Sequence, residues 1–194
     1  MMTTIKPSDI VYTTFQPRHF HQVISLGNQV HGDNYLSPTT LQDIYNKGWK
    51  DGINCSFVAL LNNKIVGFRL TYAPEQWHSD KWVTPSLWPV SKSQMAYFKC
   101  NTVAPEMQGL GIGSQLLKHS VKKSKKQGAK AGLAHIWLAS PGNSAYKYFT
   151  KNGGILLKIH PNKWQGLALY EGYVCPVCPG ICECAAGEMM LTID

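Results

Sequence analysis

Three glycines at alternate positions, Gly109, Gly111 and Gly113, form the stretch of the chain best suited to bind an anion. Glycine has no Cβ atom, so its backbone can approach a ligand closely and can adopt positive φ angles. A helix that begins here presents unpaired N–H groups at the positive end of its dipole. Such a turn can hold a phosphate or a diphosphate. It is not a Walker A loop, because no Gly-Lys-Ser/Thr follows, and it lacks the glycine spacing of a dinucleotide-binding fingerprint.

A second group that could do chemistry is a run of cysteines near the C-terminal end, Cys175, Cys178, Cys182 and Cys184. A reducing cytoplasm disfavours disulfides, whereas four thiolates could close a tetrahedral zinc site. The Cys-x-Cys half is tighter than usual, so a redox or thiol-reactive pair, an iron–sulfur centre and unliganded thiols stay open. Cys55 and Cys100 stand alone in apolar strands and are expected to be buried thiols.

A predicted strand precedes the glycines and a predicted helix follows them. Residues 97–103 form an apolar run with aromatic and β-branched side chains, which is typical of a buried strand. Pro105 cannot donate a ladder hydrogen bond, so the strand is expected to end there. The inward stripe of the helix comprises Ile112, Leu116, Leu117, Ser120, Val121 and Ser124.

The rest of the chain alternates between strand and helix patterns. Ser37 is placed to cap a helix that has Pro38 at its first position. Asn62 and Asn63 tolerate left-handed geometry, which predicts a hairpin turn. Further strands are expected at residues 10–15, 57–61, 65–72, 133–139, 155–159 and 188–193, and helices at residues 18–30, 38–47 and 144–151.

Residues 74–94 interrupt this pattern with an insertion that contains Trp77, Trp82 and Trp88. A connection of this length without regular structure is more often functional than idle. The tryptophans could plug one end of the core, or they could form the wall of a substrate pocket. The sequence leaves both interpretations open.

The composition is that of a soluble globular protein with one domain, residues 1–194, of which 44% are apolar and 15% charged. No apolar run approaches the roughly 18 residues needed to cross a bilayer, and the first twenty residues lack a signal-peptide block. We therefore expect a cytoplasmic protein without a membrane partner. Part of the net charge of +8 lies on the helix after the glycines. These lysines are expected to form a solvated helix face, and they could also attract a phosphate-rich cofactor. A nucleic-acid partner is unlikely, because no binding motif accompanies the charge.

The run Val103-Ala104-Pro105 followed by Gln108-Gly109-Leu110-Gly111-Ile112-Gly113 resembles the acetyl-CoA loop of the GNAT superfamily (GCN5-related) of N-acetyltransferases. An ordinary glycine-rich connection is the alternative. The order of predicted elements resembles the family over nearly the whole chain. The resemblance implies an α+β (α/β) GNAT fold, in which helices flank a mixed, mostly antiparallel sheet with a splayed central strand pair. A cysteine-rich loop at residues 173–187, before the last strand, is an addition to that plan.

The resemblance also implies an activity, the transfer of an acetyl group from acetyl-CoA to a primary amine that attacks the thioester directly. The backbone of Thr102, Val103 and Ala104 would contact the pantetheine arm. Asn143 and Phe149 would lie near the cofactor as well. The diphosphate would be held by Gln108, Gly109, Leu110, Gly111, Ile112, Gly113 and Ser114.

The catalytic acid and base are less clear in this sequence. The family's usual acid is a tyrosine, but alignment on Ala145 and Gly153 puts Phe149 at that position. Tyr148 lies one residue away, about 100° around a helix. Either Tyr146 or Tyr148 acts as the acid from another angle, or the CoA thiolate leaves without an enzymic acid. A thiol pKa of about 8.5 permits unassisted departure. In that case Phe149 is expected to pack against the pantetheine. The acidic candidates for the base are Glu75, Asp33 and Asp80, whereas Glu106 is expected to be a solvated or capping residue.

Two functions from different classes are compatible with these features. The first is an acetyl-CoA-dependent N-acetyltransferase. The second is a non-catalytic CoA-binding sensor or an interaction module that uses the cysteine loop. The missing tyrosine favours this second function. The acceptor stays open between a small amine, an amino acid, an antibiotic and a protein N-terminus, and a homodimer is possible.

Overall fold

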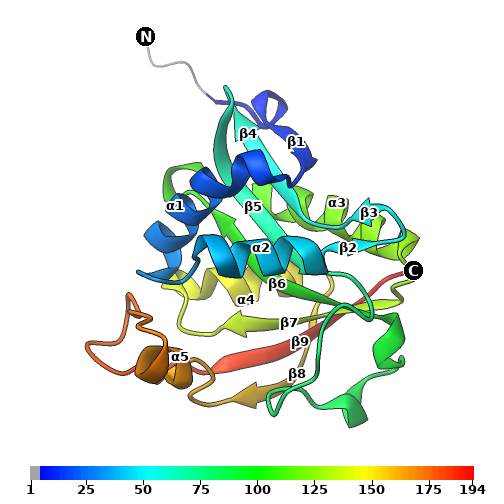
Figure 1. Ribbon diagram of the computed structural model, residues 1–194, viewed down its shortest axis with the longest axis vertical. Helices are drawn as coiled ribbons and strands as arrows, with labels where there is room; N and C mark the ends of the chain where they lie inside the picture. The colour runs from blue at the N-terminus through cyan, green and yellow to red at the C-terminus, as the bar shows by residue number, and fades with distance from the viewer. Residues whose placement is uncertain (1–4) are drawn as a thin grey trace.

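The computed structural model describes residues 5–194 and is built around one large sheet (Figure 1). The strand order in this seven-stranded sheet is β1-β4-β5-β6-β7-β9-β8. Only β6 and β7 run parallel, and the other neighbours are antiparallel. The strands are β1 Val11–Thr14, β4 Phe57–Leu61, β5 Lys64–Tyr72, β6 Met95–Val103, β7 Ala131–Trp137, β8 Ile155–His160 and β9 Ala186–Thr192. This confirms the predicted mixed, mostly antiparallel sheet.

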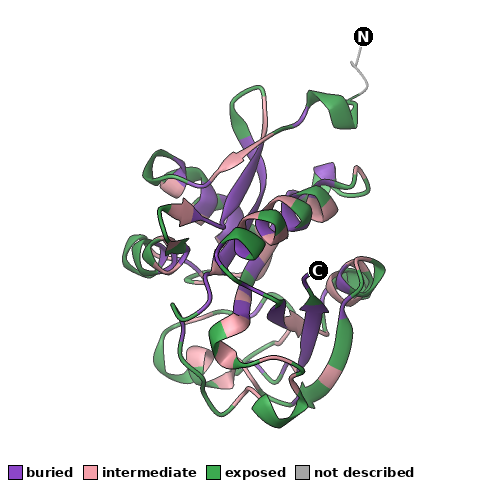
Figure 2. Cartoon of the chain, turned by 90° about the vertical axis from the view of Figure 1, so that its right-hand side faces the viewer, coloured by how far each residue is buried: buried purple, intermediate pink, exposed green. Residues whose placement is uncertain are grey.

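Helices cover both faces of the sheet (Figures 1 and 2). On one face, Gly27 of α1 packs against Phe68 of β5. On the other, Gly67 of β5 packs against Ile112 of α3. Because successive strand residues point to opposite faces, Phe68 and Gly67 show which helices cover which side. The helices are α1 Phe20–His31, α2 Pro38–Lys47, α3 Ile112–Lys126, α4 Ser144–Lys151 and α5 Gln165–Tyr170.

The feature that matters most for the site is the divergence of β6 and β7. Their parallel pairing runs from Met95, opposite Ala131, to Phe98, opposite Ala134, and it ends there although both strands continue. Beyond Phe98, β6 is paired only with β5. The two strands therefore splay apart toward their C-terminal ends, as expected.

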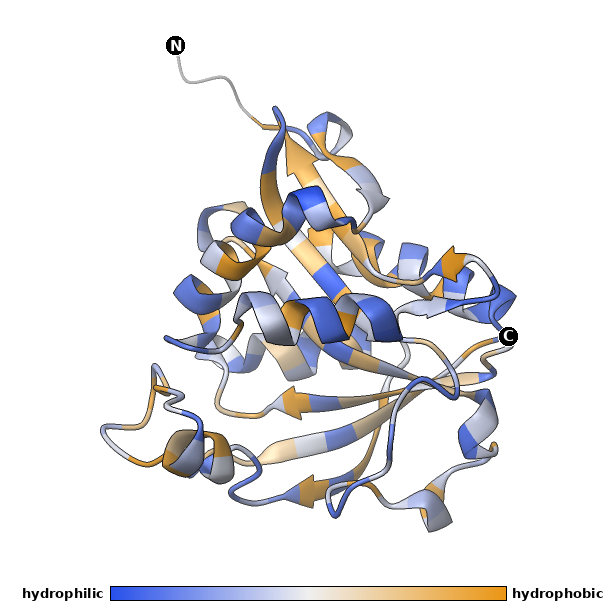
Figure 3. Ribbon diagram, viewed as in Figure 1, coloured by the Kyte–Doolittle hydropathy of each residue, from blue (hydrophilic) through white to orange (hydrophobic). Residues whose placement is uncertain are grey.

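Short-range predictions are confirmed where local chemistry decides the backbone. Ser37 Oγ accepts a hydrogen bond from the Thr40 N–H at 3.2 Å and caps α2, whose first residue is Pro38. Asn62 and Asn63 have φ angles of 49° and 62° in the turn between β4 and β5. Apolar residues are frequent along the central strands, as the orange colour in Figure 3 shows. The sequence analysis did not predict α5, the short 3-10 turns, or a two-stranded ribbon of β2 Trp49–Lys50 and β3 Ile53–Asn54.

The 74–94 insertion packs against the sheet rather than extending from it. Trp77 is buried, and its Nε1 donates to the Met95 carbonyl at 2.8 Å. Trp88 Nε1 donates to the Glu188 carboxylate at 3.3 Å. Trp77 therefore belongs to the core and Trp88, which is partly buried, packs against the same cluster, while Trp82 is also only partly buried. Within residues 5–194, no helix combines the length and the apolar content that crossing a bilayer requires.

Glu188 of β9 ties the insertion to the sheet. Its fully buried carboxylate accepts hydrogen bonds from the N–H and the hydroxyl of Thr84, both at 2.8 Å, and lies 2.9 Å from His160 Nε2. Burial raises the pKa of Glu188, but the contacts with His160, Thr84 and Trp88 outweigh it and hold the pKa below its ordinary value. The ionised carboxylate is thus the form that the folded protein stabilises.

We expect Glu188→Gln to lower the free energy of unfolding by about 2 kcal/mol at pH 7, because hydrogen bonds to a buried charge are lost. The pKa of Glu188 is lower in the folded protein than in the unfolded chain, where it is about 4.3. The ionised carboxylate therefore stabilises the fold fully at pH values above about 4.3, and this stabilisation is lost as the pH falls through the folded-state pKa. The difference in the free energy of unfolding between the parent and the variant should therefore become smaller in acid. Urea titration from pH 7 to pH 3 measures it. The exposed Glu183→Gln is the control, and a gap that stays constant with pH would contradict the assignment.

Candidate functional site

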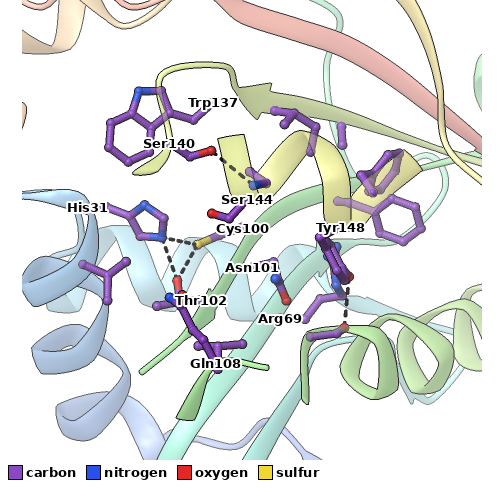
Figure 4. A pocket seen from close by; sticks show the side chains of 18 of the residues that line it. His31, Arg69, Cys100, Asn101, Thr102, Gln108, Trp137, Ser140, Ser144 and Tyr148 are labelled. Atoms are coloured by element: carbon purple, nitrogen blue, oxygen red, sulfur yellow. Dashed lines mark hydrogen bonds between the residues drawn. The ribbon is translucent and has the colours of Figure 1, made fainter. Parts of the chain in front are cut away.

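A cavity of about 710 Å³ lies where β6 and β7 diverge (Figure 4). Its size is within the usual range of ligand pockets. It runs through the sheet from the glycine turn before α3 to the end of α1, and its walls come from both faces. One continuous cavity therefore connects the predicted anion-binding turn with side chains on the opposite side of the sheet.

The glycine turn has the geometry that its sequence predicts. Gly109 and Gly111 have φ angles of 82° and 75°, and Gly111 is the residue that caps α3. A Cβ atom added to either would meet nothing within 4 Å, so the backbone faces open space. A Cβ atom on Gly113 would lie 3.2 Å from the ring of Tyr148, so this glycine also permits close packing inside the site.

Most of the residues expected to bind the cofactor line the cavity, namely Thr102, Val103, Gln108, Gly109, Gly111, Ile112, Gly113, Ser114 and Phe149. Ala104, Leu110 and Asn143 do not line it. The Ala104 N–H donates to the Val66 carbonyl and its own carbonyl accepts from Met107, so neither group is free for a ligand. Asn143 is exposed at the start of α4 with a φ angle of 55°.

Two buried polar atoms on the α3 side of the cavity lack partners. Within the described residues, Arg69 Nε and Asn101 Oδ1 form no hydrogen bond. Both side chains line the cavity, and Arg69 lies on β5 opposite Asn101 on β6. Buried polar groups are nearly always paired in folded proteins. Their orphaned state, together with the open glycine turn, fits a polar ligand such as the pantetheine and diphosphate of CoA.

Tyr148 points at the first turn of α3. Its hydroxyl accepts from Arg69 at 2.8 Å and donates to the Gly113 carbonyl at 3.0 Å. Burial raises the pKa of Tyr148, and the charge of Arg69 opposes that effect. Because the hydroxyl has one proton and Gly113 accepts it, Tyr148 is poorly placed to protonate a leaving thiolate. Phe149 turns inward instead and packs edge-on against Phe98, with ring centroids 6.0 Å apart.

On the α1 side, the thiol of Cys100 faces His31. Its sulfur lies 3.9 Å from His31 Nε2 and 3.4 Å from Thr102 Oγ1, and His31 contacts Thr102 at 2.7 Å (Figure 4). Burial raises the pKa of Cys100, but the imidazole of His31 and the Thr102 hydroxyl bring it down to about 7. Cys100 is therefore buried, as expected, but it is not an inert core residue.

A tyrosine–histidine pair bridges the divergent strands. Tyr97 of β6 and His135 of β7 contact each other through the hydroxyl and Nδ1 at 2.7 Å, and His135 Nε2 lies 2.5 Å from the Trp82 carbonyl. A carbonyl only accepts, so Nε2 carries the proton and Nδ1 accepts from Tyr97. Burial, aided by the charge of Lys163, lowers the pKa of His135 to about 4. The imidazole is thus neutral near pH 7. No sequence motif marked these two residues.

The acidic residues considered as bases lie outside this cavity, since none of Glu75, Asp33 and Asp80 contributes to its wall. Glu75 is exposed and forms an ion pair with Lys50 at 2.7 Å, which lowers the pKa of its carboxyl. Asp80 accepts from the Trp82 N–H at 2.8 Å. Tyr97 and His135, by contrast, both line the cavity.

The four clustered cysteines converge in the loop between α5 and β9. Their sulfur atoms all lie within 4.8 Å of one another, although the residues come from both halves of the loop. Trp137 and Trp164, which line the cavity, pack against them. The predicted ligand set is therefore assembled next to the cavity.

The sequence of residues 21–154 matches the model of the acetyltransferase (GNAT) family, and this match spans α1 to the end of α4. The chain belongs to the GNAT family. No curated protein is significantly similar in sequence to this GNAT protein. The matched residues include the glycine turn and both divergent strands, so most of the cavity wall belongs to the matched part, whereas Lys163, Trp164 and Tyr173 of the wall lie outside it. The cysteine loop lies outside the match.

Solved structures show the same GNAT fold at low identity. The ribosomal-protein-S18-alanine N-acetyltransferase from Escherichia coli gives a TM-score of 0.67 at 16% identity, with 95% of this chain and 94% of that chain covered. A putative acetyltransferase, yncA from Salmonella typhimurium with its cofactor acetyl-CoA, gives 0.67 at 14%, with 96% and 95% covered. Arabidopsis thaliana Naa50 in complex with a bisubstrate analogue gives 0.64 at 17%, with 95% and 99% covered.

We expect acetyl-CoA to raise the melting temperature of this GNAT protein, because a ligand that binds only the native state stabilises it, by about 2.7 kcal/mol at a hundred times its Kd. Gly111→Asp should abolish that shift by placing a negative charge where the diphosphate binds. The matched control is Gly128→Asp, at the other end of α3, where φ is also positive and an added Cβ atom also meets nothing within 4 Å. Equal shifts for the two variants in thermal denaturation would show that the glycine turn does not bind the cofactor.

Proposed function

We propose that the protein transfers the acetyl group of acetyl-CoA to a primary amine. The observation that carries this proposal is the cavity through the sheet, which connects the glycine turn on one face to the Tyr97–His135 pair on the other. A thioester that extends along the free edge of β6 would meet an amine that enters from the α1 side. Membership of the GNAT family supports the same reaction.

Acetyl-CoA would be held mainly by backbone groups. The diphosphate would lie on the glycine turn at the positive end of the α3 dipole. Beyond Phe98, β6 has no partner on its β7 side, so the pantetheine amides can pair with it as an added strand would. Arg69 and Asn101 offer the two orphaned polar atoms on this side of the cavity.

In the reaction, the amine nitrogen would attack the thioester carbonyl and form the C–N bond directly. A backbone N–H on the free edge of β6 would stabilise the oxyanion of the tetrahedral intermediate. The amine proton would pass to the Tyr97 oxygen while the Tyr97 proton moves to His135 Nδ1. Because a pKa of about 4 makes His135 a weak base and its Nε2 already donates to the Trp82 carbonyl, the proton would return from Nδ1 through Tyr97 to water in the cavity. The C–S bond would then break, and the CoA thiolate, whose pKa is close to that of a free thiol, about 8.5, would leave unassisted.

The acceptor side of the cavity is positively charged, and from this we infer that the acceptor carries an anionic group near its amine. No Asp or Glu lines the cavity, whereas Lys99 and Lys163 do. Burial lowers the pKa of Lys163 to about 8. The charge of nearby Asp80 raises this pKa, and the charge of Lys99 lowers it further. Lys99 also lines the cavity and is exposed to solvent. Asp80 and Glu171 are exposed and, within the described residues, form no ion pair with either lysine. An anion between the lysines would therefore relieve their repulsion.

We expect Tyr97→Phe to reduce kcat at least a hundredfold, because the proton path to His135 is cut. Tyr148→Phe should reduce it less than tenfold, under about 1.4 kcal/mol, since its proton is already donated to Gly113. Release of CoA from acetyl-CoA with a panel of amines measures both. The reverse ranking would make Tyr148 the acid. Absence of CoA release from protein that still binds acetyl-CoA would favour a non-catalytic CoA-binding module.

We compare two acceptors that have the same primary amine, glutamic acid α-amide, which keeps a side-chain carboxylate, and glutamine α-amide, which is uncharged at that position. We expect the glutamic acid compound to be acetylated with the higher kcat/KM. Lys163→Met and Lys99→Met should each lower kcat/KM about tenfold for the glutamate compound and little for the glutamine compound, because a charge-assisted contact is lost. The exposed Lys130→Met is the control. An equal loss for both acceptors would contradict an anion site.

A further inference from the structure

The cysteine loop has the dimensions of a metal site. Two of its sulfur–sulfur distances are 3.8 Å, between Cys175 and Cys184, and 3.6 Å, between Cys178 and Cys184, and all four sulfur atoms lie within 4.8 Å of one another. Tetrahedral zinc with Zn–S bonds of about 2.3 Å requires sulfur atoms about 3.8 Å apart. A disulfide requires about 2.05 Å. The observed spacing therefore matches ligands arranged around an ion rather than bonded pairs.

Backbone donors face two of the four sulfur atoms. The N–H groups of Val177 and Cys178 point at the sulfur of Cys175, and the Cys184 N–H points at the sulfur of Cys182. Backbone N–H donors of this kind stabilise negative charge on a ligand and fix its orientation. Three of the four cysteines are buried, and Cys178 is partly buried.

We propose that Cys175, Cys178, Cys182 and Cys184 bind one zinc ion as a closed structural site. Four protein thiolates complete a tetrahedron and leave no position for a reactive water. Soft thiolate ligands in this geometry select zinc over magnesium, calcium or manganese. The site lies in the loop between α5 and β9, outside the segment that matches the family model.

The loop is attached to the turn that joins α1 to α2, far away in the sequence. The Tyr173 hydroxyl donates to the His31 carbonyl at 2.9 Å, and the Val174 N–H donates to the Asp33 carbonyl at 3.2 Å. Asn34 Nδ2 donates to the Gly172 carbonyl at 2.9 Å. A Cβ atom on Gly32 would lie 1.9 Å from the Val174 carbonyl, so the two segments are in direct contact.

The metal would therefore brace the acceptor side of the cavity. Trp137 and Trp164 line the cavity on one side and pack against the cysteines on the other, and Tyr173 also lines it. Without the ion, nothing covalent would hold the loop closed between α5 and β9. The acceptor wall would then loosen, while the glycine turn on the opposite face of the sheet would not change. This consequence rests on the proposed acetyltransferase function, but the metal site itself does not.

The metal site is tested on the full chain purified without chelator. Elemental analysis should find one zinc per chain, and the four loop thiols should react with a thiol reagent only after a chelator has removed the metal. Replacement by cobalt should give the visible absorption of a tetrahedral cobalt thiolate. No metal together with four freely reacting thiols would overturn the proposal. So would iron in place of zinc, or disulfides among the four cysteines.

A pair of variants locates the site. Cys178→Ala, which removes the most exposed ligand, should lose the stoichiometric zinc, whereas Cys55→Ala, which changes a cysteine outside the loop, should keep it. Stoichiometric zinc in Cys178→Ala would overturn the assignment. If this variant does not fold, the cobalt spectrum of the parent protein still decides the ligand set.

The bracing role has a separate readout. Zinc-depleted protein should keep the melting-temperature shift given by acetyl-CoA, within about twofold in Kd, while its KM for the acceptor rises about tenfold or more. An unchanged acceptor KM would overturn the bracing role and leave the metal site standing. Failure of any acetyl transfer in the zinc-loaded protein would count against the proposed function alone, because zinc content and cobalt absorption are measured without turnover.

Discussion

The divergence of β6 from β7 is the constraint on which the rest of the site depends. Parallel pairing stops at Phe98, and beyond that residue the facing strand edges need other hydrogen-bond partners. A sheet that opened in this way without a ligand would expose polar backbone at its centre. The cavity, the glycine turn and the orphaned atoms of Arg69 and Asn101 all occur at this opening. The fold therefore carries an unsatisfied edge where an extended amide-containing ligand can complete it.

The alternation of side chains along β6 divides the cavity between two tasks. Asn101 lies opposite Arg69 and shares the α3 side, whereas Thr102 lies opposite Phe68 and shares the α1 side. The side with the glycine turn offers donors and the helix dipole, which suits an anionic cofactor. The other side offers a thiol, two histidines, tyrosines and lysines, and no carboxylate. A bulge in the β5–β6 ladder shifts this alternation before Tyr97 is reached, so Tyr97 lies on the α1 side, where strict alternation would put it on the side of Asn101. The two sides of the cavity therefore receive different groups from one strand.

Groups outside the cavity set the chemistry within it. The Trp82 carbonyl fixes which nitrogen of His135 carries the proton, and Trp82 belongs to the same insertion that Glu188 holds through Thr84 and Trp88. Glu188 lies directly opposite His135 in the β7–β9 ladder. The insertion is therefore neither a simple core plug nor a pocket wall. It buries Trp77 in the core, packs the partly buried Trp88 against it, and uses the carbonyl of Trp82 to orient a histidine.

The sequence by itself determined the features that depend on neighbouring residues. The glycine turn, the Ser37 cap and the Asn62-Asn63 turn follow from local backbone preferences, and the spacing of the cysteines marks a candidate ligand set within one loop. Tertiary structure decided the acid–base chemistry. Tyr97 and His135 are 38 residues apart, and Arg69 and Tyr148 are 79 apart. The acidic residues suggested by the sequence lie outside the cavity. The pKa of Cys100 falls to about 7 against the effect of burial mainly because His31, 69 residues away, packs against it. Hydrogen bonding and burial set a proton's affinity, and both arise from contacts that no short stretch of sequence contains.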